Sequence, residues 1–160
     1  MNEAIAPILG RIPSGVFILT AQGNDDLETG MLASWVQQAA FEPPSITVAV
    51  NDKRYLNDWL ETGKALAISI IGETQKSLLG HFGKGFDPGE PAFEGIELDR
   101  SPAGLPVIKD AIGWLEGTVE SSLSAGDHRV YLVRLTAASS GPRLEGEKPW
   151  VHVRKNGLGY

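Results

Sequence analysis

The sequence predicts a mainly β protein, an antiparallel β-barrel with a few flanking α-helices. Short runs rich in β-branched and apolar residues outnumber the stretches that have helical periodicity. Clusters of turn-forming residues join several of these runs, which is typical of hairpins. Glycine and proline are frequent, at 19 and 10 of the 160 residues, but stay below the level of a disordered chain. A chain of this length can bury its own core, so one domain over residues 1–160 is expected.

The predicted strands are bounded by residues that form turns or interrupt a sheet. The run at 16–21 ends at the turn 23–26, and a return strand at 28–35 completes a hairpin. Neither Pro43 nor Pro44 can donate to a central ladder, so the chain is expected to turn there. The other predicted strands cover residues 45–50, 64–71, 111–122, 128–136 and 150–153.

Helical spacing of apolar residues predicts helices at residues 53–62 and 73–83, and either a short helix or a packed N-terminal arm at residues 1–11. The middle helix follows Asp52, a capping residue, and stops at Gly63. In the last helix Leu78, Leu79 and Phe82 are expected to face inward.

Residues 86–106 contain many turn formers and little periodicity, which predicts a long loop. Loops of this length inside a compact domain are usually functional. Plain surface variation is the alternative, and the sequence leaves both interpretations open.

Composition excludes several classes of function. The chain has no cysteine, which excludes disulfides, thiolate catalysis and cysteine-based metal or iron–sulfur sites. The net charge of -6, with scattered cations, argues against a nucleic-acid-binding surface. No apolar run approaches the roughly 20 residues that span a membrane, and the first residues lack the features of a secretory signal. A cytoplasmic location is therefore expected.

The polar residues form no familiar catalytic motif. His81, His128 and His152 lack the close spacing of a metal-binding motif, so no metal is expected. The chain has neither a Gly-x-Ser-x-Gly nor a Walker loop, and no Gly-x-Gly-x-x-Gly enters a helix. Redox chemistry would then require an organic cofactor that brings its own reactivity.

The run at 30–54 combines small, aromatic, amide and cationic residues. Gly30 and Ser34 belong to a small-residue strand that a flat ligand could approach closely. Lys53 and Arg54 stand at the predicted start of a helix, a combination that suits a phosphate. Two adjacent cations are more often only a solvated turn, which is the alternative.

Flavin mononucleotide (FMN) fits this run. Small residues can satisfy the polar edge of its ring, and Trp35 could cover an apolar face. Ser34, Lys53 and Arg54 could bind its phosphate. Trp35 as an ordinary core residue remains the alternative.

Seven segments occur in an order that carries a resemblance. They are Ile12-Pro-Ser-Gly-Val, Gly30-Met-Leu-Ala-Ser-Trp-Val-Gln-Gln-Ala, Phe41-Glu-Pro-Pro, Asp52-Lys-Arg, His81-Phe, Gly126-Asp-His and Val151-His-Val-Arg-Lys-Asn-Gly-Leu-Gly-Tyr. Together they resemble the flavin reductase-like family of FMN-binding split barrels, and most closely the C-terminal flavin reductase module of diflavin flavoproteins. The similarity covers residues 11–160.

The resemblance implies a six-stranded antiparallel split barrel with Greek-key connections, and a homodimer whose interface borders the flavin. It assigns flavin binding to Gly30, Met31, Leu32, Ala33, Ser34, Trp35, Gln38 and Phe82, with Asp52, Lys53 and Arg54 on the phosphate side. It places His128 near the nicotinamide of NADH or NADPH. A plain turn residue at the start of a strand is the alternative for His128.

The predicted function is hydride transfer from NADH or NADPH to N5 of bound FMN, with no general acid or base. Two alternatives remain open. One is a non-enzymatic FMN carrier that a partner protein reduces, and the other is a ligand-binding barrel that has lost reductase activity.

Overall fold

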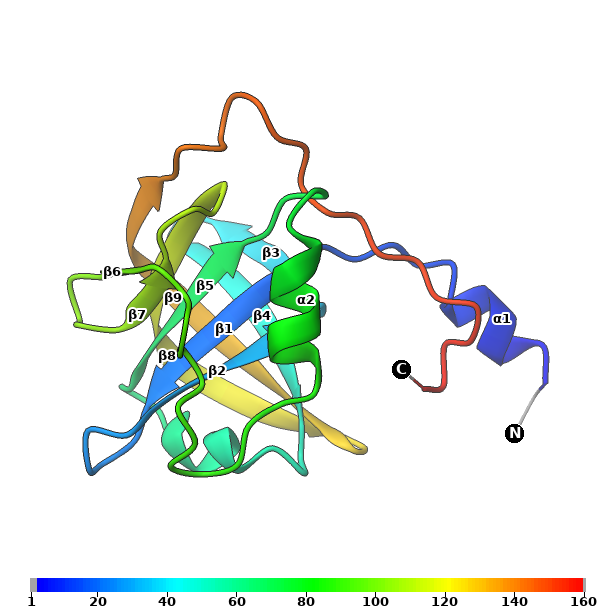
Figure 1. The fold of residues 1–160 in the computed structure, drawn as a ribbon. Coiled ribbons are helices and arrows are strands. Elements are labelled where there is room, and N and C mark those ends of the chain that lie inside the picture. The colour runs from blue at the N-terminus through cyan, green and yellow to red at the C-terminus, as the bar shows by residue number, and fades with distance from the viewer. Residues whose placement is uncertain (1–2, 160) are drawn as a thin grey trace.

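The computed structural model describes residues 3–159, and a curled antiparallel sheet forms most of it (Figure 1). The seven strands of this sheet lie in the order β2-β1-β5-β8-β9-β4-β3. They are β1 (Phe17–Gln22), β2 (Glu28–Ala33), β3 (Val36–Phe41), β4 (Pro44–Asn51), β5 (Ala65–Ile70), β8 (Gly113–Ala125) and β9 (His128–Ser140). Two short strands, β6 (Leu98–Arg100) and β7 (Pro106–Ile108), pair with each other. Three residues lie outside the described part of the chain: Met1 and Asn2, which begin the predicted N-terminal segment at 1–11, and Tyr160, which ends the closing motif.

Only two residues connect the two edge strands of the main sheet. β2 ends at Ala33 and β3 begins at Val36, so Ser34 and Trp35 bridge the first and last strands of the sheet order. The carbonyl of Trp35 accepts a hydrogen bond of 2.9 Å from the N–H of Ala49 in β4. The sheet is therefore a barrel that is split between β2 and β3, and the predicted antiparallel barrel is confirmed.

The predicted count of six strands is wrong. Residues 36–41 form a separate edge strand, β3, which was not predicted from the sequence. The predicted return strand at 28–35 ends at Ala33. At the other end of the chain, the predicted strand at 150–153 is reduced to an isolated bridge between His152 and Ser14. The predicted hairpins of β1 with β2 and of β8 with β9 are confirmed.

Alternate residues of the strands fill the interior of the barrel. The fully buried side chains include Leu19, Ile68, Val48, Val50, Tyr131 and Val133. β4 and β9 pair so that Val48 lies opposite Tyr131. Burying an apolar side chain of this size stabilises the fold by about 1.5–3 kcal/mol.

Three helical segments flank the barrel: α1 (Ile5–Leu9), α2 (Lys76–Gly83) and the 3₁₀ helix η1 (Tyr55–Trp59). The predicted helix at 73–83 is confirmed as α2, with Leu78 and Phe82 buried and Leu79 half-buried. The α-helix predicted at 53–62 is wrong, because only the five residues of η1 are helical and they form a 3₁₀ helix. None of the helices between residues 3 and 159 is long and apolar enough to cross a lipid bilayer.

The N-terminal arm, residues 3–16, and the C-terminal tail, residues 149–159, extend side by side from the barrel (Figure 1). Ser14 and His152 exchange two backbone hydrogen bonds, at 3.0 and 2.7 Å. Farther out, the N–H of Arg154 donates to the carbonyl of Gly10 at 2.9 Å. The tail is thus held to the arm by a backbone ladder.

Candidate functional site

A cleft of about 470 Å³ lies between β2, the end of β4 and α2. Its lining residues are Val16, Met31, Leu32, Ala33, Ser34, Ala49, Asn51, Lys53, Arg54, Leu79, Gly83 and His152. A volume of this size is within the range of pockets that bind small organic cofactors. Six of the predicted site residues meet here: Met31, Leu32, Ala33, Ser34, Lys53 and Arg54.

The cleft runs along α2, and two cations and a histidine line it. At the C-terminal end of α2, the guanidinium of Arg54 packs closely against the backbone of Gly85. The tail that carries His152 joins the barrel before α2 begins, where the N–H of Trp150 donates to the carbonyl of Ile71 at 3.0 Å. The eight residues of α2 span about 12 Å.

Polar contacts fix the turn at 51–54 that carries the two cations. The Lys53 N–H donates to Oδ1 of Asn51 at 3.0 Å, and Nδ2 of Asn57 donates to the carbonyls of Asn51 and Arg54, both at 2.8 Å. The Tyr131 hydroxyl donates to Oδ1 of Asn57 at 2.7 Å. Burial raises the pKa of Tyr131, so its hydroxyl stays a proton donor at neutral pH.

Asn57 and Tyr131 also explain why the helix prediction failed. The Asn57 side chain bonds to two carbonyls at the start of η1, and side-chain bonds of this kind compete with an α-helical ladder. A five-residue 3₁₀ helix has little dipole, so the two cationic side chains, and not a helix N-terminus, would attract an anion. An asparagine inside a predicted helix was the available signal, since asparagine disfavours helix interiors.

Lys53 and Arg54 form no ion pair with any carboxylate among residues 3–159. Lys53 is exposed and Arg54 is half-buried. Two cations at one end of a cleft, without a carboxylate partner in the described part of the chain, suit a dianionic group such as a phosphate monoester.

Gly30 and Phe82 pack against each other and do not line the cleft. A Cβ atom at position 30 would come within 3.0 Å of ring carbons of both Phe82 and Phe93. The glycine therefore allows these rings to pack closely on β2. Phe82 is buried in the cluster that seats α2 on the barrel.

Gln38 and Asp52 lie outside the cleft as well. Gln38 is exposed in the edge strand β3, and its side chain donates to the carbonyl of Ala40 at 3.5 Å. Asp52 is exposed in the turn, where its N–H donates to the carbonyl of Asp127 at 2.9 Å.

Trp35 and His128 stack on each other beside the cleft, with ring centroids 4.6 Å apart. The side chain of His128 is 8% exposed, and its Nδ1 lies 2.7 Å from Oδ1 of Asp127. This hydrogen bond lowers the pKa of Asp127. The guanidinium of Arg154, from the tail, lies 5.2 Å from the centroid of the Trp35 ring.

Several residues that line the cleft were not predicted from the sequence as site residues. Val16, Ala49 and Leu79 supply apolar surface, and the other missed residues are Asn51, Gly83 and His152. No motif marked them, because the cleft is assembled from four separate parts of the chain. Within residues 3–159 no three His, Asp or Glu side chains gather in a way that could hold a metal ion.

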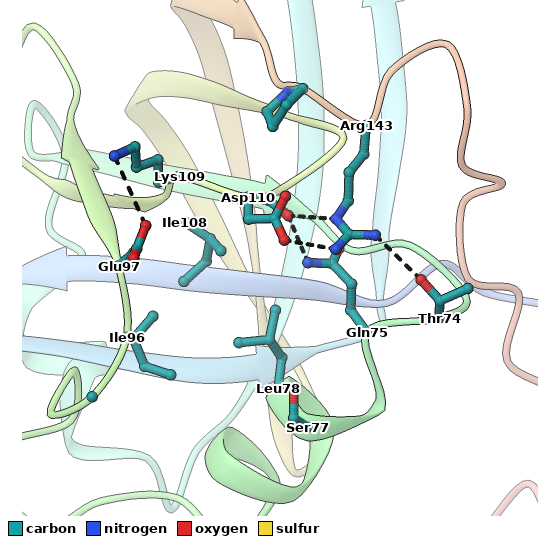
Figure 2. A pocket seen from close by; sticks show the side chains of 12 residues that line it. Thr74, Gln75, Ser77, Leu78, Ile96, Glu97, Ile108, Lys109, Asp110 and Arg143 are labelled. Carbon is teal, nitrogen blue, oxygen red and sulfur yellow. Dashed lines mark hydrogen bonds and ion pairs between the residues drawn. The ribbon is translucent and has the colours of Figure 1, made fainter.

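A second hollow, the groove, has a volume of about 530 Å³ and lies where Arg143 approaches Thr74, Gln75 and Asp110 (Figure 2). Arg143 donates to Oδ2 of Asp110 at 2.6 Å and to Oε2 of Glu147 at 3.1 Å. It also donates to the Asp110 carbonyl at 3.1 Å and to the Thr74 hydroxyl at 3.3 Å. The hydrogen bonds to the carboxylates of Asp110 and Glu147 raise the pKa of Arg143, that to Asp110 most strongly.

The family described as flavin reductase like domain matches residues 9–157. The chain belongs to this family. Diflavin flavoprotein A 1 of Synechocystis sp. is 36% identical over 161 residues, an alignment that covers 100% of this chain and 28% of that protein. The chain thus spans little more than a quarter of the length of this curated relative. The resemblance to the flavin reductase-like family and to the diflavin flavoproteins is confirmed.

The fold of the flavin reductase-like chain recurs in solved structures. The NADH:FAD oxidoreductase of Streptomyces globisporus C-1027 has a TM-score of 0.82 at 22% identity, over 92% of this chain and 85% of that chain. The same oxidoreductase in complex with NAD and FAD fragments has a TM-score of 0.79 at 22% identity, with the same coverage. These similarities confirm the split-barrel fold.

Proposed function

We propose that this flavin reductase-like chain binds FMN and catalyses hydride transfer to it from NADH or NADPH. The observation that carries the proposal is the cleft along α2. One end has two cations without a carboxylate partner among the described residues, and the remainder has small and apolar residues.

The cleft residues fit the two chemically different parts of FMN. Lys53 and Arg54 would hold the phosphate, since charge-assisted hydrogen bonds from a guanidinium and an ammonium are the strongest that this chain can offer a dianion. Leu32, Ala33 and Leu79 would pack against the ring and exclude water from it.

The chain itself supplies binding and orientation. The chemistry that the flavin supplies when bound is the acceptance of a hydride, which no side chain of this protein can perform. Ser34 and the adjoining backbone of β2 would orient the ring, and Asn57 with Tyr131 would hold the cationic turn in place. This arrangement needs no general acid or base.

The NAD and FAD fragments in the solved oxidoreductase support a nicotinamide nucleotide as the reductant. The assignment of His128 to the nicotinamide stays a prediction. The same holds for the cytoplasmic location and for a single domain over residues 1–160.

A homodimer is part of the proposal. Large apolar side chains are exposed along the arm and the tail: Ile5, Ile8, Ile12, Val151, Val153 and Leu158. An apolar surface of this kind favours burial against a second copy. A second cleft, of about 400 Å³, lies between the barrel at Trp35 and parts of the arm and the tail, and Ile12 lines it.

A second candidate function is an FMN carrier that another protein or domain reduces. The length of the curated relative favours it, because this chain corresponds to only 28% of that protein. In a longer protein the electrons could come from elsewhere in the assembly.

Anaerobic titration of the FMN-loaded protein with NADH and with NADPH tests the proposal. We expect at least one nucleotide to bleach the visible absorption of the flavin. Tight FMN binding without bleaching by either nucleotide would favour the carrier. A colourless protein that takes up no added FMN would exclude both functions.

A further inference from the structure

His152 differs from the other two histidines in what surrounds its ring. Nε2 of His81 lies 2.7 Å from the carbonyl of Ala92, and Nδ1 of His128 lies 2.7 Å from Oδ1 of Asp127. The His152 ring lines the cleft, and in the described part of the chain no residue forms a hydrogen bond or ion pair with it. Its ring nitrogens are therefore available to a molecule in the cleft.

The backbone around His152 is held firmly for a segment outside the barrel. His152 exchanges two hydrogen bonds with Ser14, and Trp150 and Arg154 on either side donate to Ile71 and Gly10. These contacts tie the tail both to the barrel and to the arm. The backbone from which the His152 side chain starts is therefore fixed in place, which a ligand-binding group requires.

The position of His152 defines which part of a ligand it can meet. Arg54 packs near Gly85, beyond the C-terminal end of α2, whereas the tail that carries His152 joins the barrel at Ile71, before α2 begins. A flavin whose phosphate is held by the cations extends its ring away from them, and His152 is the residue of the tail that lines the cleft.

We infer that His152 binds the ring end of the flavin, by donating a hydrogen bond from an imidazole N–H to the polar edge of the ring. This inference rests on the proposed function. The edge carries carbonyl and imine acceptors, and an imidazole N–H is a suitable donor to them. A donor at this edge also stabilises the negative charge that the ring carries when reduced, so His152 favours the reduced flavin.

The test compares His152→Ala and His152→Gln with the Lys53→Ala/Arg54→Ala double variant. The dissociation constants of FMN and of riboflavin, which lacks the phosphate, are measured by quenching of flavin fluorescence. We expect His152→Ala to weaken both ligands by a similar factor, about tenfold. His152→Gln should recover most of this loss, because its amide also donates. The double variant should weaken FMN alone.

A second readout separates a ring contact from a general disturbance of the tail. The midpoint potential of bound flavin should fall in His152→Ala and stay at the wild-type value in Lys155→Ala, an exposed neighbour in the same tail. Equal flavin affinity in His152→Ala and wild type would overturn the inference, as would a loss confined to FMN or an equal effect of Lys155→Ala. Wild-type protein that binds neither flavin would overturn the proposed function itself.

Discussion

The cleft and the groove both use α2 as a wall, yet their cations are held in opposite ways. In the groove, Arg143 donates to the carboxylate and carbonyl of Asp110 and to the hydroxyl of Thr74 (Figure 2), and it also donates to the carboxylate of Glu147. In the cleft, neither Lys53 nor Arg54 pairs with a carboxylate of residues 3–159. The two hollows are similar in size, at about 530 Å³ and 470 Å³. The charge that is still available to a ligand, and not the size of the hollow, therefore distinguishes the candidate binding site from the structural contact.

The sharpest test of this comparison removes the cations of the cleft. Lys53→Ala/Arg54→Ala should weaken FMN binding by about a hundredfold, since each lost charge-assisted contact weakens binding by about tenfold. Riboflavin binding should stay within about threefold of wild type, since riboflavin has no phosphate. Equal losses for the two ligands would show that these cations do not meet the phosphate.

The matched control for that test replaces exposed cations that already have carboxylate partners. Lys109 pairs with Glu97 at 3.8 Å and Arg134 pairs with Glu120 at 3.2 Å, both on the surface. Lys109→Ala/Arg134→Ala changes the net charge by the same amount and should leave both flavin affinities unchanged. A loss of FMN affinity in this control would indicate a general electrostatic effect.

The next effect concerns the support beneath the cationic turn. Tyr131→Phe removes the hydroxyl that donates to Asn57 and leaves a buried amide oxygen without its donor, which should lower the free energy of unfolding by about 1–3 kcal/mol. Because Asn57 holds the carbonyls of Asn51 and Arg54, FMN affinity should fall severalfold and riboflavin affinity less. Urea unfolding and flavin fluorescence measure the two effects separately, and an unchanged FMN affinity would show that the turn is rigid without Tyr131.

Removal of Arg143 from the groove should lower the stability of the fold and leave flavin affinity unchanged. Arg143→Ala breaks its contacts to Asp110 and Glu147, so the melting temperature should fall by a few degrees. Flavin affinity should not change, because Arg143 does not line the cleft. A loss of flavin binding at an unchanged melting temperature would reverse the assignment of the two hollows.

The barrel and its hairpins could be predicted because their signals are local. The turns at 23–26 and 126–127 stand between apolar runs, and the paired strands follow directly. β3 could not be predicted in this way. It is an edge strand with Gln37 and Gln38 exposed, so it lacks the alternation of buried residues that marks a strand.

The candidate site was predicted only where its residues are adjacent in the sequence. Met31 to Ser34 and the pair Lys53 and Arg54 line the cleft, and their flavin binding stays a prediction. The small residue Gly30 has the same sequence signature whether a ligand or an aromatic ring packs on it, and here Phe82 and Phe93 do. His152 reaches the cleft through a pairing with Ser14, 138 residues earlier, which no local pattern reveals.

The smallest expected effect is a pH dependence of stability that comes from Glu147, a carboxylate partner of Arg143. Hydrogen bonds from the backbone N–H and hydroxyl of Thr74, and then from Arg143, lower the pKa of Glu147 below its ordinary value of 4.5. The stability that ionised Glu147 contributes is therefore complete above about pH 4.5 and is lost as the pH falls through its lowered pKa. Glu147→Gln should have a lower melting temperature than wild type at pH 7, and the difference should shrink in acid. Melting curves between pH 7 and pH 3 measure it, and a constant difference would show that the Glu147 charge contributes nothing. Because Glu147 does not line the cleft, FMN affinity at pH 7 should be the same in both proteins.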